Sequence, residues 1–329
     1  MVLDYCENNL FDIEQELIDL EIEAEIAMEL LDVKHRDTLE DTFRKYLPQI
    51  IFHAAAYKHV PIMERHPQEA LYNNVLGTRN VAELADKYGA ESFILISTDK
   101  AVNPTSVMGA TKRIAELIIK DINLGSATRF AAVRFGNVLG SRGSVIPTFK
   151  KQIERGGPVT ITHQDMKRYF MTIPEAVELV IQAGAMTTGG EIFVLDMGEP
   201  VKIVDMAKDL IKLCGLEPGQ DIEIKYTGIR PGEKLYEELF SGREEMVATC
   251  HERIFISKKE LDQIYSGINN SIYTRFMNAA PDNEAIINLI AGLIPEYQKP
   301  QHSTISQMKA KAGPVVYMQE AHDQRKLGS

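Results

Sequence analysis

Cysteine is scarce in this sequence, and the few cysteines it has lie far apart. The 329 residues include three of them, Cys6, Cys214 and Cys250. Their odd number and wide spacing exclude a disulfide framework, and none has the close spacing of paired zinc ligands. We therefore expect reduced thiols and no metal site.

Long apolar runs and excess positive charge are also absent. No stretch approaches the roughly 20 apolar residues needed to cross a bilayer, and the first residues lack the basic and apolar regions of a signal peptide. The net charge of −11 argues against nucleic acid as a partner. With 44% hydrophobic and 25% charged residues, the composition is that of an ordinary globular protein. We expect a cytoplasmic protein with no membrane segment in this chain.

Apolar strand patterns alternate with amphipathic helix patterns in the first 140 residues. This alternation predicts βαβ units and a parallel, doubly wound sheet, which is an α/β fold. The predicted strands are 50–52, 93–96 and 130–135, and the predicted helices are 8–20, one starting at residue 37, 68–88 and 107–124.

The pattern becomes looser after residue 140, where glycine and proline turns separate shorter elements. We expect residues 141–299 to form a smaller substrate lobe, interleaved with the last strands of the main sheet. Residues 300–329 are polar and predict a flexible tail. The helices predicted here are 146–154, 174–185, 201–214 and 233–240, and the strands are 191–195 and 222–226.

The most informative residues follow the apolar run Phe93–Ile96. Ser97, Thr98, Asp99 and Lys100 come directly after this predicted strand, at its C-terminal end, where open α/β sheets bind ligands. The next predicted helix carries Met108 and Lys112, which are four residues apart and so share one helix face. These six residues form the predicted catalytic set.

This set resembles the catalytic residues of the extended short-chain dehydrogenase/reductases, with Met108 at the position of their tyrosine. The added Asp99-Lys100 pair makes the sequence similar to the CapD-type nucleotide-sugar 4,6-dehydratases of bacterial polysaccharide biosynthesis. The resemblance runs from about Asp4 to about residue 257. Its other strong points are residues 53–61, 73–78, 134–138 and 230–234.

The resemblance implies a Rossmann-like fold, with residues 1–140 as an NAD(P)-binding domain. Such a sheet begins with a strand and a glycine-rich turn at a helix N-terminus, which holds the pyrophosphate. Neither that turn nor the membrane-spanning region of many relatives has a counterpart here, and Val2–Asp4 resembles the second strand. We expect either a truncated form of a longer enzyme, often anchored at the inner membrane face, or a short protein with weak or no cofactor binding.

The resemblance also implies a reaction. Hydride leaves C4 of the sugar for NAD or NADP, water is lost across C5–C6, and the hydride returns to C6. Lys100 would remove the C5 proton, with a pKa lowered by burial and by Lys112, and Asp99 would protonate the departing C6 hydroxyl. Ser97 or Thr98 would contact the sugar O4, and Lys112 would hydrogen-bond the nicotinamide ribose. We expect Met108 to act only through packing.

Cofactor and substrate contacts are carried over from the resemblance in the same way. His53 is expected to be structural. The expected cofactor-binding residues are Asp4, Asp32, Val33, Ala54, Ala55, Ala56, Asn74 and Lys112. The expected contacts of the UDP-sugar are Lys58, Asn137, Arg142, Ser144, Arg168, Arg230 and Glu233.

Two other functions stay open. A UDP-sugar 4-epimerase, or another nucleotide-sugar enzyme of the same superfamily, would share the fold, although such enzymes usually need the tyrosine and have no use for the Asp99-Lys100 pair. A non-catalytic remnant that acts as a binding partner would bind neither NAD nor UDP-sugar. A homo-oligomer is expected in either case.

Overall fold

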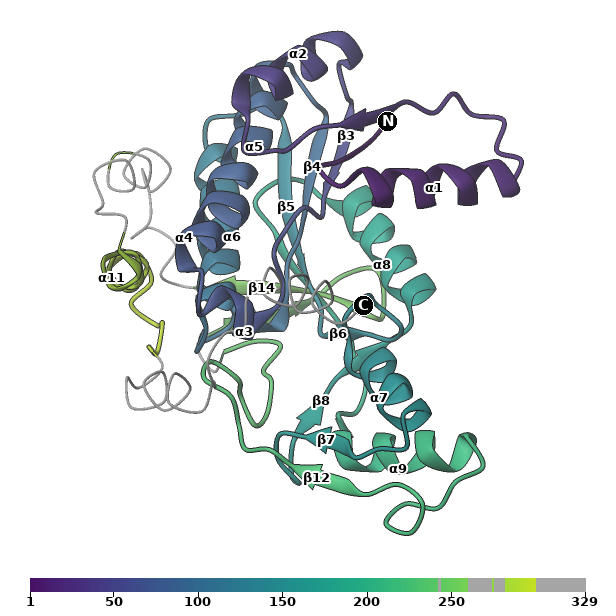
Figure 1. Cartoon of the computed structure of the whole chain (residues 1–329). Coiled ribbons are helices and arrows are strands. Elements are labelled where there is room, and N and C mark those ends of the chain that lie inside the picture. Colours follow the sequence, from purple (N-terminus) through teal and green to yellow (C-terminus); the bar gives the residue numbers. More distant parts are fainter. Residues whose placement is uncertain (242–243, 260–273, 275–281, 300–329) are drawn as a thin grey trace, which may run out of the picture.

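A six-stranded sheet forms the centre of the protein in the computed structural model, which describes residues 1–241, 244–259, 274 and 282–299 (Figure 1). The order of the strands is β13-β14-β10-β5-β4-β3, in which β10, β5, β4 and β3 are parallel to one another. At the β10 edge, β14 pairs antiparallel with β10, and β13 pairs antiparallel with β14. This order confirms the predicted doubly wound α/β fold. The strands are β3 (Ile50–His53), β4 (Ser92–Ile96), β5 (Arg129–Arg134), β10 (Ile192–Leu195), β13 (Glu244–Ala248) and β14 (Ile254–Lys259).

Strand β4 lies inside the sheet, which explains its continuous apolar sequence. Phe93, Ile94 and Leu95 are fully buried. Phe93 and Leu95 pack with the helices on one face, and Ile94 packs with α8 on the other. A parallel strand covered on both faces requires this run of apolar side chains.

Helices cover both faces of the sheet (Figure 1). The predicted helix over 68–88 is present as three consecutive helical segments, α4, η1 and α5, with a π-helical turn in the middle. On the same face lie α2 (Arg36–Tyr46), α3 (Val60–Met63), α4 (Pro67–Leu71), η1 (Tyr72–Gly77), α5 (Thr78–Lys87), α6 (Val107–Asn123) and α11 (Asn283–Leu293). On the other face lies α8 (Ile173–Met186).

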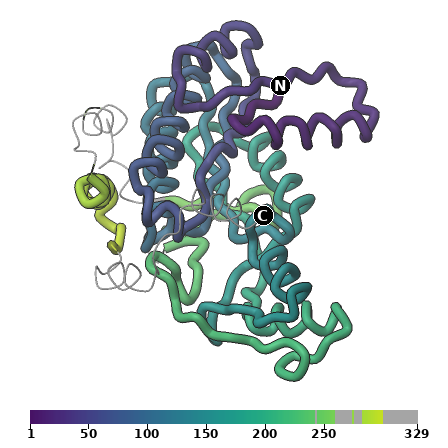
Figure 2. Tube along the Cα trace, in the orientation of Figure 1, coloured from purple at the N-terminus to yellow at the C-terminus, as the bar shows by residue number. Residues whose placement is uncertain are grey.

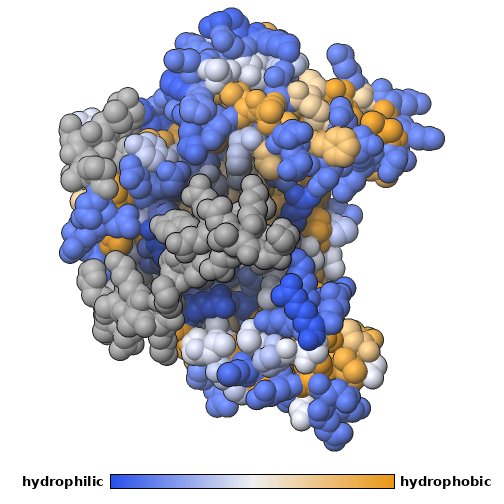
Figure 3. Space-filling view, in the orientation of Figure 1, coloured by the Kyte–Doolittle hydropathy of each residue, from blue (hydrophilic) through white to orange (hydrophobic). Residues whose placement is uncertain are grey.

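The N-terminal strands form a separate parallel pair beside the sheet. β1 (Val2–Asp4) pairs with β2 (Met28–Leu30), and α1 (Glu7–Asp19) follows β1. Among the described residues no strand joins this pair to β3, so the β3 edge is open and its Ile50 is 57% exposed. Figure 3 shows apolar side chains gathered in this upper part of the molecule. The gap between the β1–β2 pair and β3 is the place where the first strand of the expected Rossmann-like sheet would lie.

A smaller lobe with its own core lies below the sheet, and the chain enters it and returns (Figure 2). The lobe core contains Phe149, Ile153 and Val159. α8 packs on the main sheet, and β10 and β14 are strands of it, so segments of the lobe alternate along the chain with segments of the main sheet. Its elements are β6 (Asn137–Val138), α7 (Val145–Glu154), β7 (Val159–Ile161), β8 (Lys167–Arg168), β9 (Phe170–Met171), β11 (Val201–Lys202), α9 (Ile203–Leu213) and β12 (Ile224–Tyr226).

One predicted helix is wrong. Residues 233–240 form a loop, because their backbone is bonded to other segments: the Arg168 guanidinium donates to the carbonyls of Lys234 and Leu235. The predicted tail over 300–329 lies outside the described residues. Within the described part of the chain, no helix has both the length and the apolar character to cross a membrane.

Candidate active site

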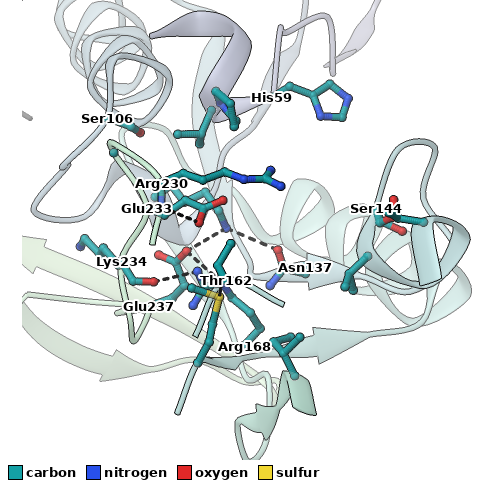
Figure 4. Close-up of a pocket in the computed structure, with 18 of the residues that line it drawn as sticks. His59, Ser106, Asn137, Ser144, Thr162, Arg168, Arg230, Glu233, Lys234 and Glu237 are labelled. Atoms are coloured by element: carbon teal, nitrogen blue, oxygen red, sulfur yellow. Dashed lines mark hydrogen bonds and ion pairs between the residues drawn. The ribbon is translucent and has the colours of Figure 1, made fainter. Parts of the chain in front are cut away.

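A cavity of about 320 Å³ lies between the C-terminal ends of the parallel strands and the lobe (Figure 4). It is rich in charged and polar side chains that come from both parts of the protein. In Figure 4, Asn137, Arg168 and Glu237 converge on its centre. The polar residues that line it include Lys58, His59, Lys100, Asn137, Ser144, Arg168, Arg230, Glu233 and Glu237.

The predicted pair Asp99 and Lys100 is formed at the end of β4. Both residues belong to the 3₁₀ turn η2 (Asp99–Ala101), which Thr98 caps by accepting from the Lys100 backbone N–H. The Lys100 ammonium donates to Asp99 Oδ1 at 2.9 Å, and the Thr98 hydroxyl donates to the same oxygen at 2.8 Å. Asp99 is fully buried, and its second oxygen has no partner among the described residues.

A second carboxylate reaches Lys100 from the loop after Arg230. Glu237 Oε1 lies 3.5 Å from Lys100 Nζ and 3.4 Å from Arg168 Nε. Asn137 Oδ1 is also 3.5 Å from Lys100 Nζ. The sequence analysis did not single out Glu237; its one signal was its position three residues after the 230–234 motif.

These contacts correct the expectation for Lys100. Burial alone would lower the pKa of its amine, but the carboxylates of Asp99 and Glu237 outweigh burial and raise this pKa above its ordinary value. Lys112 does not act on it as expected. The resting state is therefore an ammonium held between two carboxylates.

Ser97 points away from the cavity. Its hydroxyl donates to Glu116 Oε1 at 2.6 Å. Glu116 in turn binds Arg134 through both carboxylate oxygens, each at 2.8 Å, and Arg113 at 3.0 Å. Burial would raise the pKa of Glu116, but the guanidinium of Arg134 leads the groups that lower it to about 2. This buried network joins β4 to α6 and β5, so Ser97 supports the site from behind.

Met108 and Lys112 lie one turn apart in α6, as predicted, and both are buried. Met108 is part of an apolar cluster with Val60 and Leu71, in agreement with a packing role. Burial lowers the pKa of Lys112 to about 8. Burial, with a smaller contribution from Lys112, lowers the pKa of His53 to about 3, so His53 stays neutral and bonds the Thr78 hydroxyl at 3.0 Å.

A second, larger groove of about 650 Å³ runs between the β1–β2 pair and the edge of β3. The expected cofactor residues Asp4, Asp32, Val33 and Ala54–Ala56 line it. Asn74 does not; it is fully buried and fixes the segment after β3. The predicted cofactor residues at the ends of β1, β2 and β3 therefore share one groove.

Asn74 explains how the segment after β3 is ordered. Its amide oxygen accepts from the Tyr57 N–H at 2.7 Å, and its amide nitrogen donates to the Tyr57 carbonyl at 3.0 Å and to the Thr111 hydroxyl at 3.1 Å. These bonds tie residue 57 to α6. Lys58 and His59 are thereby placed at the cavity.

Six of the seven expected substrate residues line the cavity, and Arg142 does not. The Arg142 guanidinium is exposed and pairs with Asp12 of α1 at 2.5 Å. Ser144 stands at the N-terminus of α7, where its hydroxyl is buried without a partner in the described part of the chain. No cluster of metal-ligating side chains occurs among the described residues.

The fold is a doubly wound α/β sheet with a charged, polar cavity at the C-terminal ends of its parallel strands. The sequence pattern described as "Polysaccharide biosynthesis protein" matches residues 1–259, and the chain belongs to that family. The probable polysaccharide biosynthesis protein EpsC of Bacillus subtilis is 62% identical over 230 residues, which are 70% of this chain and 38% of EpsC. The capsular polysaccharide biosynthesis protein CapD of Staphylococcus aureus is 55% identical over 260 residues, 78% of this chain and 43% of CapD. The chain thus spans about two fifths of these relatives.

Among solved structures, Pen from Bacillus thuringiensis is 34% identical with a TM-score of 0.72, over 79% of this chain and 81% of Pen. More distant relatives carry two different activities in their names. A UDP-N-acetylglucosamine 4,6-dehydratase (inverting) of Campylobacter jejuni is 37% identical over 64% of this chain and 61% of its own length. A UDP-glucose 4-epimerase of Rickettsia rickettsii is 41% identical over 59% of this chain and 56% of its own length.

Proposed function

We propose that this protein carries the catalytic site of a nucleotide-sugar 4,6-dehydratase that acts on UDP-N-acetylglucosamine with NAD or NADP. The observation that carries the proposal is the Asp99–Lys100 contact at the end of β4, facing a cavity lined by cationic side chains. An epimerase moves a hydride and one hydroxyl proton, so an acid–base pair beside the sugar is needed only when water must also be eliminated.

The pair can perform the elimination with every proton accounted for. Moving one proton from Lys100 Nζ to Asp99 Oδ1, across 2.9 Å, gives a neutral amine and a carboxylic acid. The amine then accepts the C5 proton of the 4-keto sugar. As the C6–O bond breaks, the acid donates its proton to the departing oxygen, which leaves as water. Both groups have then returned to the ion pair seen in the structure.

Cationic groups around the cavity suit a nucleoside diphosphate. Lys58 and Arg230 line it, and so does Ser144 at the N-terminus of α7, whose hydroxyl has no partner among the described residues. A helix N-terminus and nearby cations favour phosphate oxygens. We do not assign Arg168 to the phosphates, because its guanidinium already donates to three carbonyls and forms an ion pair with Glu237.

The groove beside β3 fits the adenosine end of NAD or NADP. Ala54–Ala56 leave the backbone after β3 open to close approach, and Asp4 and Asp32 place carboxylates at the ends of β1 and β2. When bound, the cofactor takes up a hydride from the sugar and returns it. The resemblance assigns the nicotinamide ribose to Lys112, which is buried, has a pKa lowered to about 8, and does not line this groove.

The test uses a form of the protein in which a first strand and glycine-rich turn are restored, incubates it with NAD and UDP-N-acetylglucosamine, and follows the nucleotide-sugar by mass spectrometry. A dehydratase gives a product lighter by one water, and Lys100→Ala abolishes it. A product of unchanged mass whose opposite C4 configuration is established by NMR would identify an epimerase instead. If this restored form bound neither NAD nor UDP-sugar in calorimetry, that result would favour a non-catalytic binding partner.

A further inference from the structure

Glu237 is a buried carboxylate whose position the proposed reaction does not by itself explain. Its side chain is 3% exposed, and its Oε1 faces Lys100 Nζ at 3.5 Å and Arg168 Nε at 3.4 Å. Its Oε2 is buried without a hydrogen-bond partner in the described part of the chain. A carboxylate is costly to bury unless opposite charges compensate it, so Lys100 and Arg168 account for its presence here.

The loop that carries Glu237 is held from two sides. Arg168 donates to the carbonyls of Lys234 at 2.7 Å and Leu235 at 3.2 Å. The Lys234 ammonium donates to the Val102 carbonyl at 2.8 Å, just after η2. The loop is therefore fixed to the lobe and to the segment that follows Lys100. Glu237 has a defined place relative to the Lys100 ammonium.

The charges around Lys100 balance only when Glu237 is ionised. Lys100 and Arg168 carry two positive charges, and Asp99 and Glu237 carry two negative ones. Asp99, Glu237 and Arg168 are the charged side chains that act on the Lys100 amine. Without Glu237, two cations would share one carboxylate in a buried site, and the ammonium form of Lys100 would lose part of its stabilisation.

We propose that Glu237 is a positioning residue that holds the Lys100 ammonium beside Asp99 and preserves its charge between turnovers. Its meaning for catalysis rests on the proposed dehydratase, in which Lys100 must end each elimination protonated. The contact itself can be tested without substrate, cofactor or turnover.

The experiment compares the reactivity of Lys100 in the unmodified chain, in Glu237→Gln and in Glu238→Gln. Glu238 is the adjacent, exposed carboxylate, so its substitution removes the same charge from the same loop without touching Lys100. Each protein is pulse-labelled with acetic anhydride at several pH values, and acetylation of Lys100 is quantified by peptide mass spectrometry. The exposed Lys212 on α9 serves as the internal standard. Only the neutral amine reacts, so the pH dependence reports the charge state of Lys100.

An opposite charge at this range shifts a pKa by about 1–3 units. In Glu237→Gln we therefore expect labelling of Lys100 to rise by about tenfold or more at a pH below its titration. Labelling of Lys212 in this variant, and labelling of Lys100 in Glu238→Gln, should stay unchanged. Labelling within twofold of the unmodified chain would overturn the proposal. An equal rise in both variants would also overturn it, because that result reports a loosened loop. Circular dichroism melting identifies a variant that has not folded. If Glu237→Gln does not fold, Glu237→Met, which keeps the side-chain length without the charge, takes its place and must give the same rise in Lys100 labelling.

Discussion

At the scale of single residues, the contact between Asp99 and Lys100 decides what chemistry the cavity can perform. We expect Lys100→Ala and Asp99→Asn each to lose at least about 10²-fold in formation of the 4-keto-6-deoxy sugar, because general acid–base groups contribute about 10²–10⁴-fold. The measurement is product formation by the form of the protein in which a first strand and glycine-rich turn are restored. Lys212→Ala, on the exposed face of α9, is the control. Either variant keeping more than about a tenth of the activity would show that these roles are wrong.

Met108 occupies the position of the superfamily tyrosine, but it is packed in an apolar cluster. We expect Met108→Tyr to bring no large gain in rate and to destabilise the fold by about 1–3 kcal/mol, because the larger side chain overpacks the cluster. Rates and urea unfolding measure the two effects. A gain of about two orders of magnitude would instead show that the missing hydroxyl limits turnover.

Lys112 is buried with a pKa of about 8, below the ordinary lysine value of 10.5. The unfolded chain therefore binds more protons than the folded chain between these two values, and stability contributed by this group rises with pH across that window. At pH 7 the buried ammonium opposes folding, so Lys112→Met should stabilise the protein by up to about 3 kcal/mol. The gain should shrink as the pH rises from about 8 to 10.5. Urea unfolding at pH 7 and pH 10 tests this, and an equal effect at both values would contradict it.

At the scale of the elements, Glu116 joins α6 to β5 and, through Arg134, to β13. Arg134 donates to Glu116 and also to Glu244 at 3.1 Å. Glu116→Gln leaves a buried guanidinium with a weaker partner, and removing one member of a buried ion pair costs about 3–5 kcal/mol. We expect a loss of that order in urea unfolding at pH 7.

The pH dependence of this loss has a definite sign. Burial opposes ionisation of Glu116, yet Arg134 and its neighbours lower the pKa to about 2 in the folded chain, from an ordinary 4.5. The stabilisation is therefore present above about pH 4.5 and is lost as the pH falls through about 2. If the variant and the unmodified chain still differed fully at the acid end, Glu116 would not be the titrating group.

At the scale of the whole molecule, the gap between the β1–β2 pair and β3 leads us to predict weak cofactor binding. The described residues place no glycine-rich turn at a helix N-terminus beside the groove, so a pyrophosphate would lack the backbone donors that neutralise it. Charge-assisted hydrogen bonds contribute about 1.5–3 kcal/mol each. Losing two or three should weaken NAD binding by about two to six orders of magnitude.

Calorimetry with NAD and NADP on the 329-residue chain measures this directly. We expect the chain to purify without bound cofactor, to have marginal stability, and to show no measurable dehydratase activity unless another chain supplies a strand. NAD or NADP found in the purified protein by mass spectrometry, or turnover of UDP-N-acetylglucosamine, would refute that expectation.

Elements with local signals could be predicted from the order of residues alone. The apolar run at 93–96 became β4, and the periodic stretch at 107–124 became α6. Because a buried parallel strand needs a continuous apolar run and its end faces the ligand side of the sheet, the order of residues also located Thr98, Asp99 and Lys100. The four-residue spacing placed Met108 and Lys112 on one helix face.

Features that depend on distant partners could not be predicted in this way and became visible in the folded chain. Residues 233–240 have a helical pattern, yet Arg168, more than 60 positions earlier, binds their carbonyls and holds them as a loop. That loop brings Glu237 to Lys100 and reverses the expected direction of its pKa shift. Arg142 pairs with Asp12 of α1 and lies away from the cavity. Charge interactions act through space, so the sequence could supply the charged residues but not the pairs they form.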